Sequence, residues 1–371
     1  MEAFKYGCVV SGDNFCHRSD LSAQLAGYIK SGQNLVIQGE RRIGKTSLVH
    51  DTLSRMKGYK SVNADFMGVK STTDVCNRIV DAMTRFDVDE SFLRRTLSAL
   101  VHLRPVGTID PMTGMPSISL DARATAHPSS VVTALDALID HVKGRKVCVV
   151  FDEFQDILDV KDGEQILALM RGRIQFLQDV CFIFLGSARN KMLSLFLSPN
   201  SPFYKSATVF DVGEIPDDDF YDFAKGRFAL GERKLPRAVF DRILDLVART
   251  SGDVQELCDA IWQTSSRGET LSDENIEKGI NLVFARESSA YAIFIKPLTD
   301  IQLRVLTALS ELGGAHTLAN VFLERSRITS PTTIKRALVA LGKAELIYQL
   351  GGEWKFVSPF FREWIRRRAI A

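Results

Sequence analysis

The chain has 371 residues, of which 45% are hydrophobic and 25% charged, with a formal net charge of +2, so we expect an ordinary soluble globular protein of two or three domains. No apolar run approaches about 18 residues and the N-terminus lacks an apolar signal region, which predicts a cytoplasmic protein with no membrane partner. The six cysteines are scattered without a C-x-x-C pair, which argues against a disulfide framework or a zinc site.

The first expected element is a helix that begins near Ser19, the expected N-cap. Leu21, Leu25 and Ile29 recur at helical spacing, and the pair Ser31-Gly32 ends the pattern.

A P-loop follows this helix. The apolar run 35–37 leads into Gly39-x-x-x-x-Gly44-Lys45-Thr46, and a helical pattern continues through residue 53. Backbone N–H groups of such a loop, together with the positive end of the next helix, bind phosphate oxygens. We therefore expect Lys45 to reach the β- and γ-phosphates of ATP and the Thr46 hydroxyl to bind Mg²⁺. The expected nucleotide-binding residues here are Gly39, Glu40, Arg41, Arg42, Ile43, Gly44, Lys45, Thr46 and Ser47.

The next stretch predicts a strand over 59–66, a helix over 72–85 and a hairpin insertion within 101–122. The hairpin is expected to turn around Asp110–Gly114, where Pro and Gly are frequent. Such a hairpin can contact a partner, or it can be a neutral insertion.

A second chemical motif follows a predicted helix over 129–143. Residues 147–151 are all apolar, as in a parallel strand that is buried on both faces, and Asp152 and Glu153 come directly after them. We interpret Asp152 as the Walker B ligand of Mg²⁺ and Glu153 as the catalytic residue that polarises the attacking water. The alternative is that both carboxylates only cap a helix. Further elements are expected over 162–178 (helix), 180–185 (strand) and 208–212 (strand).

From residue 216 onward the pattern becomes helical, with expected helices near 216–229, 236–250, 253–266 and 272–287. Three short helices over 298–312, 317–324 and 331–341, a hairpin over 345–357 and a last helix over 360–368 predict a winged helix. Residues 316–371 hold ten Lys or Arg and four Asp or Glu, a local charge of +6. Lys335 and Arg336, on the third helix, are the candidate contacts to double-stranded DNA, unless they are only solvated.

Taken together, the chain resembles the archaeal-type ATPases at the border of the AAA+ and STAND groups of P-loop NTPases. The resemblance rests on Gly39–Leu48, Phe151-Asp-Glu-Phe154, Leu185-Gly-Ser187, Ser201-Pro-Phe-Tyr204 and Ser358–Trp364. It implies an α/β P-loop parallel sheet over 1–213, an α-helical lid over 214–296 and a C-terminal winged-helix domain over 297–371. ATP would act on this architecture as a conformational switch.

The resemblance also implies roles for further residues. Ser187, at the tip of the strand after Walker B, would be sensor 1, with Arg189 as a second candidate. Val9 and Val10 would pack around the adenine, or they would pack in the hydrophobic core. Arg171 and Arg173 would be arginine fingers toward a neighbouring subunit, or merely solvated.

The chain departs from the family pattern in the lid. Residues 250–254 hold no proline in the place of the usual Gly-x-Pro, and no arginine follows before Arg267, so a sensor 2 arginine is not predicted.

Two functional hypotheses follow from these patterns. In the first, ATP binding drives assembly on DNA, including self-assembly into an oligomer. In the second, the chain is a signalling or defence switch whose winged helix contacts a protein partner. The basic third helix favours the first.

Overall fold

The computed structural model describes residues 3–86, 105–109, 116–120, 126–186 and 189–370, with the backbone alone for residues 105–109, 116–120, 189–190 and 369–370. The chain divides into two compact units, one formed by Val9–Gly213 and the other by Met1–Cys8 together with Glu214–Ala371. The N-terminal segment, expected within the core at 1–213, thus groups with the second unit, where Phe4 packs on Phe228 with ring centroids 4.9 Å apart.

The first unit is built on five parallel strands in the order β2-β5-β6-β1-β7, which confirms the predicted parallel sheet. The strands are β1 Leu35–Gln38, β2 Lys60–Asp65, β5 Val147–Asp152, β6 Cys181–Leu185 and β7 Thr208–Asp211. Because parallel strands end at the same edge of a sheet, the residues that follow β1 and β5 lie at one edge, with only β6 between the two strands.

Helices cover both faces of this sheet. The helices are α1 Ser19–Lys30, α2 Lys45–Arg55, α3 Thr72–Phe86, α5 Pro128–Val142, α6 Gly163–Ile174 and α7 Arg189–Leu197. Alternate residues of β5 face opposite sides: Cys148 and Val150 pack in the cluster of α1 and α2, and Val149 and Phe151 in that of α3, α5, α6 and α7. The continuous apolar run before Asp152 therefore reflects burial on both faces, as the sequence predicted.

Two local differences from the sequence prediction stand out in this unit. Helix α7 was not predicted, because only a short apolar repeat, Met192 with Leu195 and Phe196, marks it, and all three side chains are buried. Helix α6 ends at Ile174 rather than near 178. The predicted hairpin is present as the antiparallel pair β3 Pro105–Ile109 and β4 Pro116–Leu120, and its expected turn at Asp110–Gly114 lies outside the described residues.

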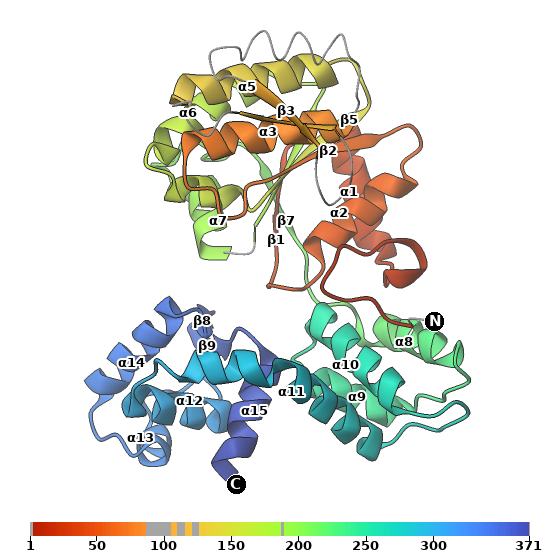
Figure 1. The fold of residues 1–371 in the computed structure, drawn as a ribbon, viewed down its shortest axis with the longest axis vertical. Helices are drawn as coiled ribbons and strands as arrows, with labels where there is room; N and C mark the ends of the chain where they lie inside the picture. The colour runs from red at the N-terminus through yellow and green to blue at the C-terminus, as the bar shows by residue number, and fades with distance from the viewer. Residues whose placement is uncertain (1–2, 87–104, 110–115, 121–125, 187–188, 371) are drawn as a thin grey trace. The chain divides into compact units, whose positions relative to one another are not determined.

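The second unit is helical apart from one hairpin. Its elements are α8 Asp217–Ala229, α9 Arg237–Leu246, α10 Ser251–Thr264, α11 Asp273–Ile295, α12 Asp300–Leu312, α13 Asn320–Ser326, α14 Pro331–Lys343, β8 Ile347–Leu350, β9 Glu353–Phe356 and α15 Pro359–Ile370. Helices α12 to α14 followed by the β8–β9 hairpin form the predicted winged helix (Figure 1). Helix α11 continues well past the expected end near 287, because Tyr291 is buried against the rings of Phe361 and Trp364.

The last helix uses its arginines within the fold. Arg366 and Arg367 both pair with the buried Glu363, and Arg367 also pairs with Glu277 of α11 at 2.7 Å. Arg362 donates to the carbonyl oxygen of Leu246. Much of the positive charge at the end of the chain therefore fixes α15 in place. No helix in the described ranges is both long and apolar enough to cross a lipid bilayer.

Candidate active site

The loop between β1 and α2 has the backbone geometry that its glycines allow. A Cβ at Gly39 would lie 2.6 Å from the carbonyl oxygen of Val212, so only glycine fits against the end of β7. Gly44 caps α2 in the left-handed region with a φ of 92°, a conformation that other residues rarely adopt. Helix α2 begins at Lys45, and its first N–H groups therefore point toward the space in front of the loop.

Lys45 is buried and is held by the loop itself. Its Nζ donates to the carbonyl oxygens of Gly39, at 3.2 Å, and Glu40, at 2.9 Å. The positive charge of Lys45 therefore lies beside the backbone amides of the loop. An anion with several phosphates needs such a charge for binding. Arg41 and Arg42 are exposed, and Ile43 is buried below the loop.

Thr46 and Asp152 meet across the sheet edge. The Thr46 Oγ1 donates to Asp152 Oδ2 at 3.1 Å, although 106 positions separate the two residues in the chain. Burial raises the pKa of the Asp152 carboxyl above its ordinary value. A hydroxyl and a carboxylate are the oxygen ligands that Mg²⁺ prefers, so these two side chains fit that ion.

Glu153 follows Asp152 in a left-handed conformation, with a φ of 46°. Its Oε2 accepts a hydrogen bond from Gln155 Nε2 at 2.5 Å, and the same nitrogen donates to Asp156 Oδ1 at 3.0 Å. Gln155 is only 1% exposed, and a Cβ at Gly186 would overlap its Oε1 at 2.0 Å, so the glycine at the end of β6 leaves the space that the amide fills. The carboxylate of Glu153 is thus oriented by a hydrogen bond from a buried amide.

The segment before α1 is fastened to α2. The N–H of Val10 donates to Ser47 Oγ at 3.1 Å, and that of Gly12 donates to Asp51 Oδ1 at 3.0 Å. Asp51 is fully buried and also contacts His17 Nδ1 at 3.2 Å. Val10 packs in the core beside α1 and α2, whereas Val9 is 52% exposed.

Arg18 joins the loop to the end of the first unit. Its Nη2 donates to the carbonyl oxygen of Ile43 at 2.8 Å, and its Nη1 donates to that of Gly213 at 2.7 Å. Burial lowers the pKa of the guanidinium below its ordinary value. One buried side chain therefore supports the backbone of the loop directly before Gly44.

The predicted sensor and arginine-finger residues are only partly described by the structure. Ser187 lies outside the described residues, and only the backbone of Arg189 is described, as the first residue of α7. Arg173 pairs with Asp136 of α5 at 3.1 Å, and Arg171 is half-buried on α6. The roles of these residues as sensors or arginine fingers stay predictions.

On the winged helix, Lys335 and Arg336 are exposed on α14, as predicted. Thr332 is exposed in the first turn of the same helix, beside the half-buried Thr333. The inner side of α14 carries Ile334, Leu338 and Leu341, which are buried. The helix therefore presents a polar, basic side to the surroundings.

Known proteins share this architecture. A family model described as a probable winged helix domain matches residues 289–367. The Walker-type ATPase PABY2304 of Pyrococcus abyssi superposes with a TM-score of 0.64 at 15% identity, covering 96% of this chain and 97% of that one. The ORC1 protein of Aeropyrum pernix, solved in complex with DNA, gives a TM-score of 0.51 at 14% identity over 96% and 94% of the two chains. No curated protein matches the sequence.

The chain has the fold of a P-loop ATPase with a C-terminal winged helix. The resemblance to archaeal ATPases, found in the motifs, is thereby confirmed for the fold.

Sequence reasoning missed three residues that shape this site, Gln155, Arg18 and Asp51. The carbonyl oxygens that accept from the Arg18 side chain lie 25 and 195 positions away. Asp51 has one local partner, Arg55 on the same helix, but its contacts to Gly12 and His17, which fasten the segment before α1, lie 39 and 34 positions away. Gln155 stands two positions after Glu153, and its burial beside Gly186 gives it its role.

We predict that Arg18→Ala destabilises the first unit by about 2–3 kcal/mol, because two carbonyl oxygens lose a charged donor. Thermal unfolding should show a lower melting temperature, and nucleotide affinity should fall as the loop loosens. The matched control is Lys191→Ala, which removes an exposed pair with Asp159 and should cost less than about 1 kcal/mol. Equal melting temperatures for the two variants would contradict this role of Arg18.

We predict that Gln155→Ala lowers the rate of ATP hydrolysis about tenfold to a hundredfold, because Glu153 loses the charge-assisted hydrogen bond that orients it. The thermal shift caused by Mg-ATP should stay as in wild type, since the side-chain hydrogen bonds of Gln155 go to Glu153 and Asp156. An exposed glutamine on the same unit, Gln175, provides the control substitution to Ala. A turnover rate equal to that of the control would refute the orienting role.

Proposed function

We propose that this chain binds Mg-ATP at the loop 39–46, hydrolyses it, and uses the nucleotide state as a conformational switch. The observation that carries the proposal is the hydrogen bond from Thr46 to Asp152, which joins the Walker A helix to the Walker B strand. Two chance sequence matches would not be expected to meet in this way. The two motifs follow β1 and β5, which are not neighbours because β6 lies between them.

Each residue has a distinct role in this proposal. The loop amides and Lys45 bind the phosphates, and Thr46 and Asp152 hold Mg²⁺. Mg-ATP supplies the phosphoryl group and the metal charge that offsets the charge of the phosphates. Glu153 accepts a hydrogen bond from the attacking water and so orients it, while Gln155 fixes the direction of the Glu153 carboxylate.

We further propose that the winged helix binds double-stranded DNA and that ATP promotes self-assembly there. The exposed Lys335 and Arg336 on α14 support DNA binding, as does the likeness in fold to the ORC1 protein that was solved with DNA. Arg171, Arg173 and Arg189 remain the candidates for completing a neighbour's site.

The alternative is a signalling or defence switch whose winged helix contacts a protein. The pairing of Arg366 and Arg367 with acidic side chains favours it, because these cations are then less available to phosphates. Arg325 of α13 likewise pairs with Glu311.

We predict that Mg-ATP raises the melting temperature of the wild-type chain and leaves that of Lys45→Ala unchanged. Ligand binding to the folded state contributes about 2.7 kcal/mol at a hundredfold excess over Kd. Glu153→Gln should keep the thermal shift and lose phosphate release, because binding does not require the carboxylate. Full turnover by Glu153→Gln would remove Glu153 from the catalytic role.

We predict that DNA binding depends steeply on salt and weakly on sequence, because it proceeds chiefly through phosphates. Lys335→Ala should weaken binding by a similar factor on unrelated duplexes and reduce the slope of log K against log salt by about one. Fluorescence anisotropy in Mg-ATP measures both quantities, with Lys278→Ala on α11 as a control for the loss of a surface cation. No binding even at low salt would favour the protein-partner switch.

A further inference from the structure

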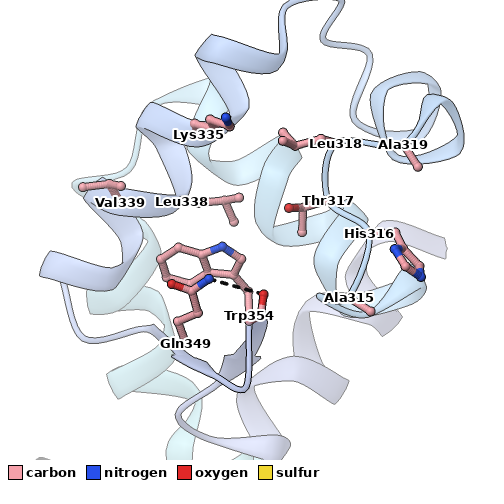
Figure 2. Close-up of a pocket in the computed structure, with 11 residues that line it drawn as sticks. Ala315, His316, Thr317, Leu318, Ala319, Lys335, Leu338, Val339, Gln349 and Trp354 are labelled. Atoms are coloured by element: carbon pink, nitrogen blue, oxygen red, sulfur yellow. Dashed lines mark hydrogen bonds between the residues drawn. The ribbon is translucent and has the colours of Figure 1, made fainter. Parts of the chain in front are cut away.

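The winged helix contains a hollow of about 510 Å³ whose wall comes from three places in the chain. These are the connection between α12 and α13, helix α14, and the β8–β9 hairpin, which forms the wing. Figure 2 shows the indole of Trp354 in the middle of the residues that line it. Its volume lies in the range of sites that hold small organic molecules.

Trp354 is fixed in the hollow by two glycines. Its backbone N–H donates to the carbonyl oxygen of Gly314 at 3.2 Å, and a Cβ at Gly314 would lie 1.8 Å from the carbonyl oxygen of Trp354. On α14, an added Cβ at Gly342 would lie 3.2 Å from the indole ring, which therefore packs directly on that helix. The aromatic surface is thus held by close backbone packing rather than by a flexible contact.

The wall combines apolar and polar groups. Leu338 is buried beside the indole, and Leu318 and Val339 form exposed apolar edges. The polar side chains are Thr317, which is buried, and His316 and Gln349, which are exposed. The Gln349 amide donates to the carbonyl oxygen of Gly352 in the wing at 3.3 Å, as the dashed line in Figure 2 marks.

The charge of the wall has one sign. Lys335 is the lysine among the residues that line the hollow, and these described lining residues include no carboxylate. The hollow therefore suits a ligand with a flat, partly apolar body, an edge that forms hydrogen bonds, and a negative charge close by. A nucleotide has these three properties, since its base stacks on aromatic rings and its phosphate is an anion.

We propose that the hollow binds one unpaired nucleobase of DNA, stacked on Trp354, with the adjoining phosphate at Lys335. A base within an intact duplex is covered by its neighbours and its partner, so only a base in a single-stranded tail or an opened pair can enter. This inference rests on the proposed DNA binding, and it adds a preference for duplex DNA that carries unpaired bases.

The test compares three DNA molecules by fluorescence anisotropy with the full chain in Mg-ATP. These are a blunt duplex, the same duplex with a short thymidine tail, and the same duplex with an abasic tail that has equal phosphates. Because the two tails differ only in their bases, phosphate contacts contribute equally to both affinities and do not affect their ratio. Wild type should bind the thymidine tail about 5-fold to 150-fold more tightly than the abasic tail, the range expected for one stacked base.

Variants then assign the effect to the hollow. Trp354→Ala should abolish the difference between the two tails and leave binding of the blunt duplex unchanged, whereas Trp354→Phe should retain most of it. Val321→Ala, which removes an apolar side chain of α13 that is 63% exposed and does not line the hollow, should behave as wild type.

Photocrosslinking of the wild-type chain tests the same proposal without a variant that could fail to fold. A tail that carries 5-iodouracil should crosslink to Trp354 on irradiation, as mapped by mass spectrometry. Equal affinity for the thymidine and abasic tails, or crosslinks only outside the hollow, would overturn this inference while blunt-duplex binding persists. Absence of binding to all three DNA molecules would overturn the proposed DNA function and this inference together.

Discussion

The hydrogen bond between Thr46 and Asp152 is the constraint on which the candidate active site depends. It joins Thr46, in the helix that follows β1, to Asp152 at the end of β5. Strand β6 lies between β1 and β5, and its Phe184 is the register partner of Val36 in β1 and of Phe151 in β5. A slip of one residue in either pairing would reverse the faces of a whole strand and move its end out of line with the other. The packing of large rings around Phe184 therefore also holds the distance between the two motifs.

The sequence predicted those parts of the site that depend on local patterns. The loop after β1 and the carboxylates after β5 are marked by short runs of residue types, because phosphate binding and a strand buried on both faces each impose strict local chemistry. Arg18 and Gln155 are different, since their importance comes from burial against Ile43, Gly213 and Gly186. Contacts of this kind are decided by the tertiary fold, and one sequence does not display them.

In the C-terminal region, too, local patterns were predicted from the sequence and tertiary contacts were not. The spacing of the three short helices and the hairpin pattern over 345–357 were sufficient to predict a winged helix. The local charge of +6 was a poorer guide, because a count of residues does not tell which cations are paired. Arg366 and Arg367 pair with carboxylates in the fold, whereas Lys335 is exposed on α14. Positive charge that neutralises internal carboxylates contributes little to the attraction of an anionic partner, so fewer cations of this domain are available for such an attraction than the sequence indicates.

An ATPase switch requires that a change at the loop alters a distant part of the chain. The candidate nucleotide and DNA sites belong to different units, which are joined covalently at Cys8–Val9 and at Gly213–Glu214. Arg18 bonds both to Ile43 in the loop and to Gly213, the last residue before the second of these connections. A shift of the loop that broke the first bond would leave a buried guanidinium with one acceptor fewer, which is costly. Arg18 is therefore the side chain through which the proposed switch would connect the loop to residue 213.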